Sequence, residues 1–252
     1  MVKLSLNEIC AKLKHAGRLE SDPLCVYGSE TIPATSISSV SINRCIANAI
    51  YSLATNSEHS TIHFEEDSER KSCPGGQAWL GYKPLMPHLK YMLSTGTPDF
   101  RDGWSEFLIA DPDLTEKRLK DVGIIKSLGK YTIISKDYQD IDEHAKIEMI
   151  LCFGNAQQVR NLCSLFYFHS EQSHGIQVPW GPVCSSFVSY PAGLIENGPK
   201  NRVIVGPTDP TGNKWFPGNY MSIGIPYDIA VQMARDVESS FIGKHPKVAY
   251  PE

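Results

Sequence analysis

The chain has 252 residues, enough to bury a sizeable core, and its 41% hydrophobic and 21% charged residues exclude a disordered protein. A formal net charge of −4 offers no basic surface for nucleic acid. No apolar run approaches the roughly 20 residues of a membrane span, and the first 17 residues predict an amphipathic helix rather than a signal peptide. We therefore expect a cytoplasmic protein that binds neither nucleic acid nor membrane.

Helices and strands alternate along the first half of the chain. Ser5 and Glu8 form a capping-box pattern at the start of the first helix, and Asn43 is a candidate cap of the second. Two prolines break the apolar segment after Cys73 into two short helices. The predicted elements are helices at 5–16 and 43–55, strands at 23–27 and 61–64, the two short helices within 73–96, and a helix at 116–122.

The second half continues this alternation and shows no internal sequence repeat. Asn155 caps the longest predicted helix, and a Gly/Pro-rich loop at 206–219 is a candidate cover for a site. The predicted elements are strands at 131–135, 147–153, 175–178, 202–205 and 221–225, and helices at 156–172, 185–192 and 227–241.

This order of elements predicts an α/β fold in which a mixed sheet is layered with helices. We expect a single compact domain over 1–252. The Gly-, Pro- and Asp-rich segment 95–115 is the best candidate for a long connection or loop insertion.

Seven cysteines form an odd set without CxxC spacing, so we expect neither a disulfide framework nor a contiguous zinc motif. Three of them share a setting that the others lack. Cys45 lies in the first turn of a predicted helix, Cys73 precedes Pro74-Gly75-Gly76 and a helical segment, and Cys184 precedes another helical segment. A helix start favours a thiolate, and Gly75 and Gly76 let the backbone approach a cluster or an anion closely.

The remaining cysteines, Cys10, Cys25, Cys152 and Cys163, lie within predicted apolar faces or strands, so we expect them in the core. No two histidines form a pair on one helical face. His63 and His174 are near enough in the sequence to Cys73 and Cys184 to be weak candidates for a shared site.

Five spaced segments, RCIANAI, SCPGGQAWLG, ILCFGNAQQVRNL, PVCSSFVSYPAG and MSIGIPYDIA, resemble the family called domain of unknown function 169, which is widespread in archaea and anaerobic bacteria. The resemblance runs in order from about Pro23 to the closing helix. Members are similar in carrying cysteines at the places of Cys45, Cys73 and Cys184. The chain departs from the family at PTDPTGNKWFPGN, where the resemblance leads us to expect a short glycine and arginine turn.

The leading hypothesis is a metal-binding protein in which Cys45, Cys73 and Cys184 hold a [4Fe–4S] cluster. One iron would be left open for a small-molecule substrate, as in an iron–sulfur-dependent lyase or redox enzyme. Zinc held by the three cysteines and His174 or His63 also satisfies the ligand rules. The alternative is a metal-free enzyme or binding module in which one reactive thiolate, Cys73 first, acts as nucleophile. A domain with only buried cysteines is a third reading, and homo-oligomerisation stays open.

Overall fold

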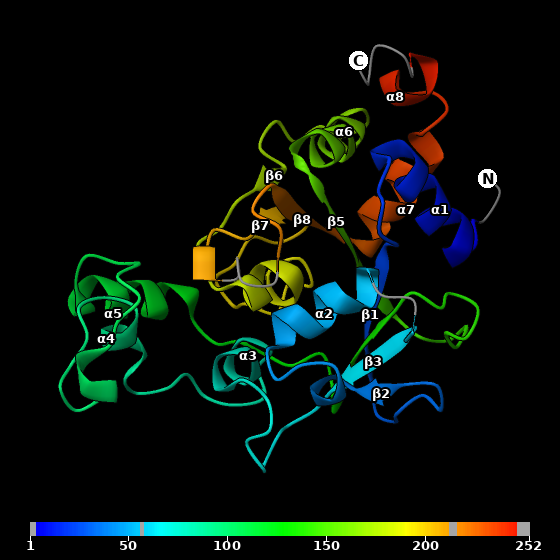
Figure 1. Ribbon diagram of the computed structural model, residues 1–252. Helices are drawn as coiled ribbons and strands as arrows, with labels where there is room; N and C mark the ends of the chain where they lie inside the picture. Colours follow the sequence, from blue (N-terminus) through cyan, green and yellow to red (C-terminus); the bar gives the residue numbers. More distant parts are fainter. Residues whose placement is uncertain (1–3, 56–57, 212–215, 246–252) are drawn as a thin grey trace.

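A computed structural model describes residues 4–55, 58–211 and 216–245. These residues form one eight-stranded mixed sheet in the order β2-β3-β4-β1-β5-β8-β7-β6 (Figure 1). The strands are β1 Leu24–Ser29, β2 Ile37–Ser38, β3 Thr61–Phe64, β4 Tyr131–Ser135, β5 Ile147–Asn155, β6 Ile176–Gln177, β7 Val203–Gly206 and β8 Tyr220–Pro226. The predicted α/β architecture is therefore confirmed.

Helices connect these strands and cover both faces of the sheet. The α-helices are α1 Leu6–Gly17, α2 Ile46–Thr55, α3 Pro74–Trp79, α4 Leu89–Met92, α5 Pro112–Val122, α6 Ala156–Tyr167, α7 Tyr227–Asp236 and α8 Phe241–Lys244. Shorter helical segments are the 3-10 turns η1 Ser39–Ser41 and η2 Arg101–Gly103, and the π-helical turn η3 Ser185–Ser189. No helix of the described residues is both long enough and apolar enough to cross a membrane.

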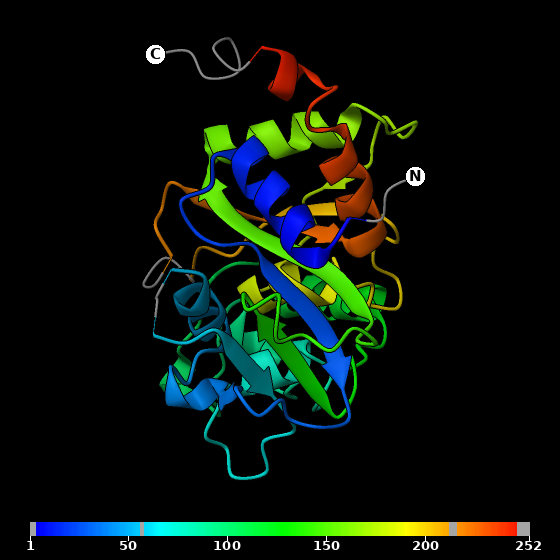
Figure 2. The ribbon, with the colours of Figure 1, turned by 90° about the vertical axis from the view of Figure 1, so that its right-hand side faces the viewer.

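The sheet separates two hydrophobic cores. Cys25 and Tyr27 of β1 point toward α1, α6 and α7, whereas Leu24 and Val26 point toward α2, α3 and η3. This is the two-residue alternation of a strand that is buried on both faces. Figure 2 shows α1, α6 and α7 gathered on one side of the sheet. The three cysteines that begin helical elements lie on the other side, around α2, α3 and η3.

Local caps explain why several helices begin where they do. Ser5 and Glu8 form the predicted capping box, with the Ser5 N–H donating to Glu8 at 2.7 Å. Asn155 and Gln158 form a second capping box at the start of α6. The Asn43 side chain accepts a hydrogen bond from the Cys45 N–H at 2.8 Å, but α2 begins only at Ile46, so Asn43 stabilises the turn before the helix and is not its N-cap as predicted.

The two halves of the sheet have the same topology. β1 to β4 are arranged as β2-β3-β4-β1, and β5 to β8 as β6-β7-β8-β5, so the sheet order reads the same from either edge. β2 pairs in parallel with β3, and β6 with β7, while the other neighbouring pairs are antiparallel. Neither half was recognisable as a repeat from its sequence.

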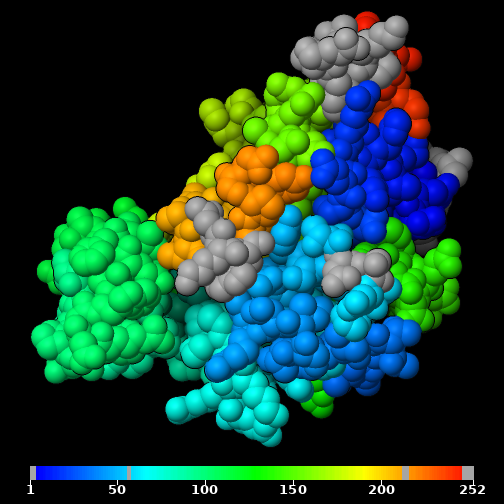
Figure 3. Space-filling view, viewed as in Figure 1, coloured from blue at the N-terminus to red at the C-terminus, as the bar shows by residue number. Residues whose placement is uncertain are grey.

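The segment between β3 and β4 carries α3, α4 and α5, and part of it extends away from the sheet. α4 and α5 pack against each other, joined by the ion pair of Lys90 with Glu116, and Glu116 also pairs with Lys120 within α5. Figure 3 shows this part as a lobe that projects to one side of the molecule. The stretch 93–111, which includes most of the predicted long connection, joins α4 to α5 and contains η2.

Candidate functional site

Cys45, Cys73 and Cys184 each lie at the beginning of a helical element, as predicted. Cys45 immediately precedes α2, and its carbonyl oxygen accepts the Ala49 N–H at 3.0 Å. Cys73 is the N-cap residue of α3, and Cys184 is the N-cap residue of η3. Three separate connections of the sheet therefore present a cysteine at a helix start.

A backbone hydrogen bond and a close helix contact bring Cys73 beside Cys45. The Cys73 N–H donates to the carbonyl oxygen of Arg44 at 2.8 Å. Two residues into α3, Gly76 lies against Ile46 so closely that a Cβ added there would be 2.7 Å from Ile46 Cδ1. Gly75 has more room, since an added Cβ would be 3.8 Å from Cys73 Sγ. Gly76 is thus the residue that allows α3 to approach α2.

The segment before Cys73 is held in place by its own side chains. The Asp67 carboxylate accepts the Ser72 hydroxyl at 2.8 Å, and the Gln77 side chain accepts the Asp67 N–H at 3.0 Å. From the other side, Arg44 Nε donates to the Lys71 carbonyl at 2.9 Å. These bonds fix the chain on both sides of Cys73.

The helical turn η3, which begins after Cys184, packs against α3, which begins after Cys73. The Ser189 hydroxyl donates to the Trp79 carbonyl, which ties η3 to α3, and the rings of Trp79 and Trp180 pack edge to face 6.2 Å apart. Burial raises the pKa of both Cys45 and Cys184, and the backbone N–H of Ala47, in the first turn of α2, lowers the pKa of each.

Burial dominates the protonation of these thiols. It raises the pKa of Cys45, and it raises the pKa of Cys184, which is only 8% exposed, well above the usual value. The sulfur of Cys73 and the carboxylate of Asp209 raise the pKa of both thiols further, because negative charges nearby disfavour a thiolate. The thiols of Cys45 and Cys184 therefore each lie within electrostatic reach of Cys73 and Asp209.

Asp209 and Glu106 are residues of this region that sequence reasoning did not single out. Burial raises the pKa of the half-buried Glu106, Asp209 raises it further, and Arg101 lowers it. The two carboxyl groups therefore lie near each other, Glu106 between η2 and α5 and Asp209 after β7. The only sequence signal was that Asp209 belongs to the loop 206–219, which departs from the family pattern.

The described residues include no group of three His, Cys, Asp or Glu side chains that could hold a single metal ion. The two candidate histidines lie elsewhere. His63 Nδ1 hydrogen-bonds the Ser36 hydroxyl at 3.0 Å, and its ring packs edge to face against Tyr131. His174 is exposed in the segment before β6. Neither belongs to a metal-holding group in this part of the chain.

The other four cysteines occupy the opposite core, as expected. Cys10, Cys25 and Cys152 are fully buried beneath α1, with the sulfurs of Cys10 and Cys25 3.8 Å apart. Cys163 is partly buried on α6 and packs against the same core. Burial raises the pKa of Cys25 and Cys152 well above the usual value and that of Cys163 to about 11. These thiols are packing residues.

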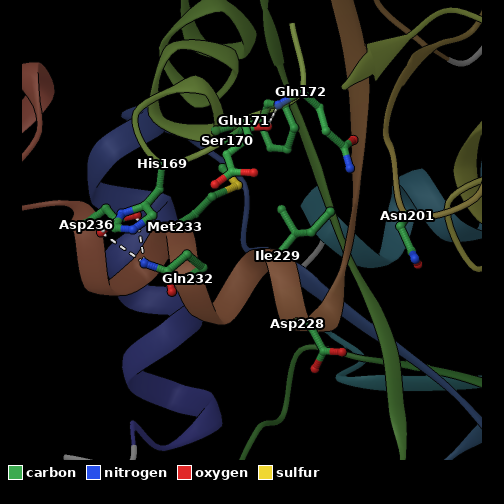
Figure 4. A pocket seen from close by; sticks show the side chains of 11 residues that line it. His169, Ser170, Glu171, Gln172, Asn201, Asp228, Ile229, Gln232, Met233 and Asp236 are labelled. Atoms are coloured by element: carbon green, nitrogen blue, oxygen red, sulfur yellow. Dashed lines mark hydrogen bonds and ion pairs between the residues drawn. The ribbon is translucent and has the colours of Figure 1, made fainter. Parts of the chain in front are cut away.

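Two cavities in the described part of the chain can be compared with the cysteine site. One of about 290 Å³ has Ser72, Gln77 and His63 among its lining residues, but not Cys73. Another of about 400 Å³ lies between the end of α6 and α7 (Figure 4). There the Asp236 carboxylate lies 3.3 Å from His169 Nδ1 and accepts two hydrogen bonds from Gln232 at 3.1 Å. Neither of these two cavities is lined by a cysteine.

No curated protein and no solved structure gives a significant match to the chain. One protein-family model, described as an uncharacterised ArCR, does match, and it spans residues 12–236. The matched span runs from within α1 to the end of α7 and includes all three helix-start cysteines. The chain therefore belongs to the DUF169 family, domain of unknown function 169.

Proposed function

We propose that the protein binds a [4Fe–4S] cluster through Cys45, Cys73 and Cys184, with one iron left without a cysteine for a small-molecule substrate. The observation that carries the proposal is the meeting of three cysteine-bearing helix starts, α2, α3 and η3, on one side of the sheet. Thiolates are the ligands that iron–sulfur clusters select. The reducing cytoplasm, in which we place the protein, keeps such thiols free.

The electrostatics of the site support a cationic occupant. Burial holds the thiols of Cys45 and Cys184 in their neutral form, and the neighbouring Asp209 carboxylate opposes ionisation further. Bound metal deprotonates its thiol ligands and supplies the positive charge that this group of acids lacks. Nothing in a purely structural role requires three thiols and a carboxylate to lie together.

The chain's own groups would hold and tune the cluster. The Ala47 N–H lowers the pKa of both Cys45 and Cys184 and so would stabilise negative charge on their sulfurs, and N–H groups near cluster sulfurs shift cluster potentials. The α3–α2 contact at Gly76 sets the position of Cys73. When bound, the cluster supplies a Lewis-acidic iron for a lyase or an electron-transfer centre for a redox enzyme.

Anaerobic purification followed by iron, sulfide and zinc analysis tests the proposal. Wild-type protein should contain iron and sulfide and absorb broadly in the visible range. Single Cys→Ser changes at 45, 73 and 184 should each reduce the bound iron strongly. The matched control is Cys163→Ser, a partly buried cysteine in the opposite core, which should leave the iron content unchanged. Zinc in place of iron, or equal loss in the control variant, would contradict the proposal.

A metal-free thiol site is the second candidate function. Cys73 is less buried than Cys184, and its neighbour Ser72 lines the cavity of about 290 Å³. Alkylation of the metal-free protein as a function of pH separates the two. A single thiol at Cys73 that reacts well below the pH of the others favours a nucleophile. Three thiols that a chelator releases together favour the metal site.

A further inference from the structure

Because the two halves of the sheet share one topology, the connection that carries each cysteine has an equivalent connection in the other half. Cys45 lies between β2 and β3, and Cys184 lies between β6 and β7, so they occupy equivalent connections of the two halves. In both connections a helical element begins right after the cysteine, and a tyrosine follows six residues later, Tyr51 and Tyr190. Cys45 and Cys184 are thus counterparts.

Cys73 has no cysteine counterpart. It lies between β3 and β4, and the equivalent connection in the second half runs from β7 to β8, over residues 207–219. This connection contains no cysteine and one acidic residue, Asp209. If the two halves approach the site in the same way, the side chain that faces Cys73 across it is the Asp209 carboxylate.

Contacts at both ends hold the described part of this loop against the cysteine site. Before Asp209, the Thr208 hydroxyl hydrogen-bonds the carbonyl oxygens of Pro179 at 3.4 Å and Gly181 at 3.5 Å, just before Cys184. Figure 1 shows the orange segment after β7 running beside the yellow coil of η3.

Farther along the loop, the buried Phe216 packs against a ring on each of the two counterpart helices. Its ring centroid lies 5.0 Å from that of Tyr51 on α2 and 5.8 Å from that of Phe187 on η3. The loop is thus anchored on both helices whose first residues follow Cys45 and Cys184.

We propose that Asp209 supplies the fourth ligand of the site, its carboxylate binding the iron that no cysteine reaches. This inference rests on the cluster proposed above and names the residue at its remaining position. A carboxylate is a harder and weaker ligand for iron of a cluster than a thiolate, so a substrate carrying an oxygen donor can displace it. Asp209 would therefore close the fourth iron at rest and release it to substrate.

The test compares anaerobically purified wild-type protein with three variants, Asp209→Ala, Asp209→Asn and Asp209→Cys. Mild oxidation releases an iron that lacks a cysteine, and electron paramagnetic resonance detects the three-iron cluster that remains. We expect the Ala and Asn variants to lose this iron faster than wild type, on the order of tenfold, and the Cys variant to lose it more slowly. Asp99→Ala, an exposed carboxylate change between α4 and α5, should match wild type.

The outcomes separate this inference from the proposed function. Equal rates of iron loss in wild type and all Asp209 variants overturn the assignment of Asp209 and leave the three-cysteine cluster in place. Wild-type protein that holds no iron overturns both. Circular dichroism of each variant, together with the isosteric Asp209→Asn change, excludes misfolding as the cause of a difference.

Discussion

Replacing Gly76 with alanine tests the contact that places Cys73 beside Cys45. The added Cβ would lie 2.7, 2.9 and 3.0 Å from three atoms of the Ile46 side chain, which is fully buried. Overpacking of this kind lowers the free energy of unfolding by about 1–3 kcal/mol. The higher helix propensity of alanine relative to glycine raises it by up to about 1 kcal/mol.

The neighbouring Gly75 provides the matched control. Its added Cβ would meet only Cys73 Sγ, at the ordinary contact distance of 3.8 Å. Because both glycines lie in the first turn of α3, the gain in helix propensity largely cancels between the two alanine variants. Gly76→Ala should therefore be less stable than Gly75→Ala by about 1–3 kcal/mol, which is the overpacking cost alone.

Urea denaturation of the metal-free proteins measures this difference. A second change, Ile46→Val, removes the Cδ1 atom nearest to the new methyl group, so it should restore about 1 kcal/mol in the Gly76→Ala background while destabilising wild type by about 0.5–1.5 kcal/mol. Equal stability of the two glycine variants, or no coupling between positions 46 and 76, would refute the packing argument.

Two further predictions concern pH. Burial lowers the pKa of His63, so its contribution to stability is present above the ordinary histidine pKa of about 6.5 and is lost as the pH falls through the lowered value. Urea titrations should show that wild type loses stability more steeply below pH 6.5 than His63→Gln does. Parallel curves for the two proteins would contradict this. Lys90 and Lys120 lower the pKa of Glu116 to about 2, so its contribution is present above about 4.5 and is lost toward pH 2. Hydrogen exchange should show faster opening of α4 and α5 in Glu116→Gln at pH 7, an effect that added salt reduces, and unchanged exchange would count against the ion pairs.

Most of the elements could be predicted from local patterns. The strands at 61–64 and 131–135 have the predicted bounds, because short apolar segments bounded by turn residues leave little choice. The predicted helix at 156–172 was too long, since α6 ends at Tyr167. Beyond it the chain turns outward, and Phe168 and His169 are exposed. Nothing in the apolar spacing marks that turn.

Other features depended on tertiary contacts that the sequence does not display. β2 has two residues and pairs with β3. Two residues are too few to show the alternation of apolar and polar side chains that marks a strand, so the Ser- and Thr-rich segment around β2 did not reveal it. The predicted helix at 185–192 became the π-helical turn η3 of five residues, Ser185–Ser189. The predicted closing helix at 227–241 divides into α7 and α8.

The candidate site was predictable in part. Helix starts follow from local sequence, which is why Cys45, Cys73 and Cys184 could be selected from seven cysteines. Asp209 could not be selected in this way, because its relation to the cysteines arises only from the pairing of β7 with β8 and the anchoring of Phe216. Glu106 comes from the lobe of α4 and α5, which the sequence marks only as a long connection.

Anomalous diffraction from crystals grown without oxygen, recorded at the iron and zinc absorption edges, tests the central claim most directly. We expect an iron peak bounded by the sulfurs of Cys45, Cys73 and Cys184, with Asp209 on the remaining side. A peak at the zinc edge alone, or anomalous density that lies away from these three sulfurs, would contradict it.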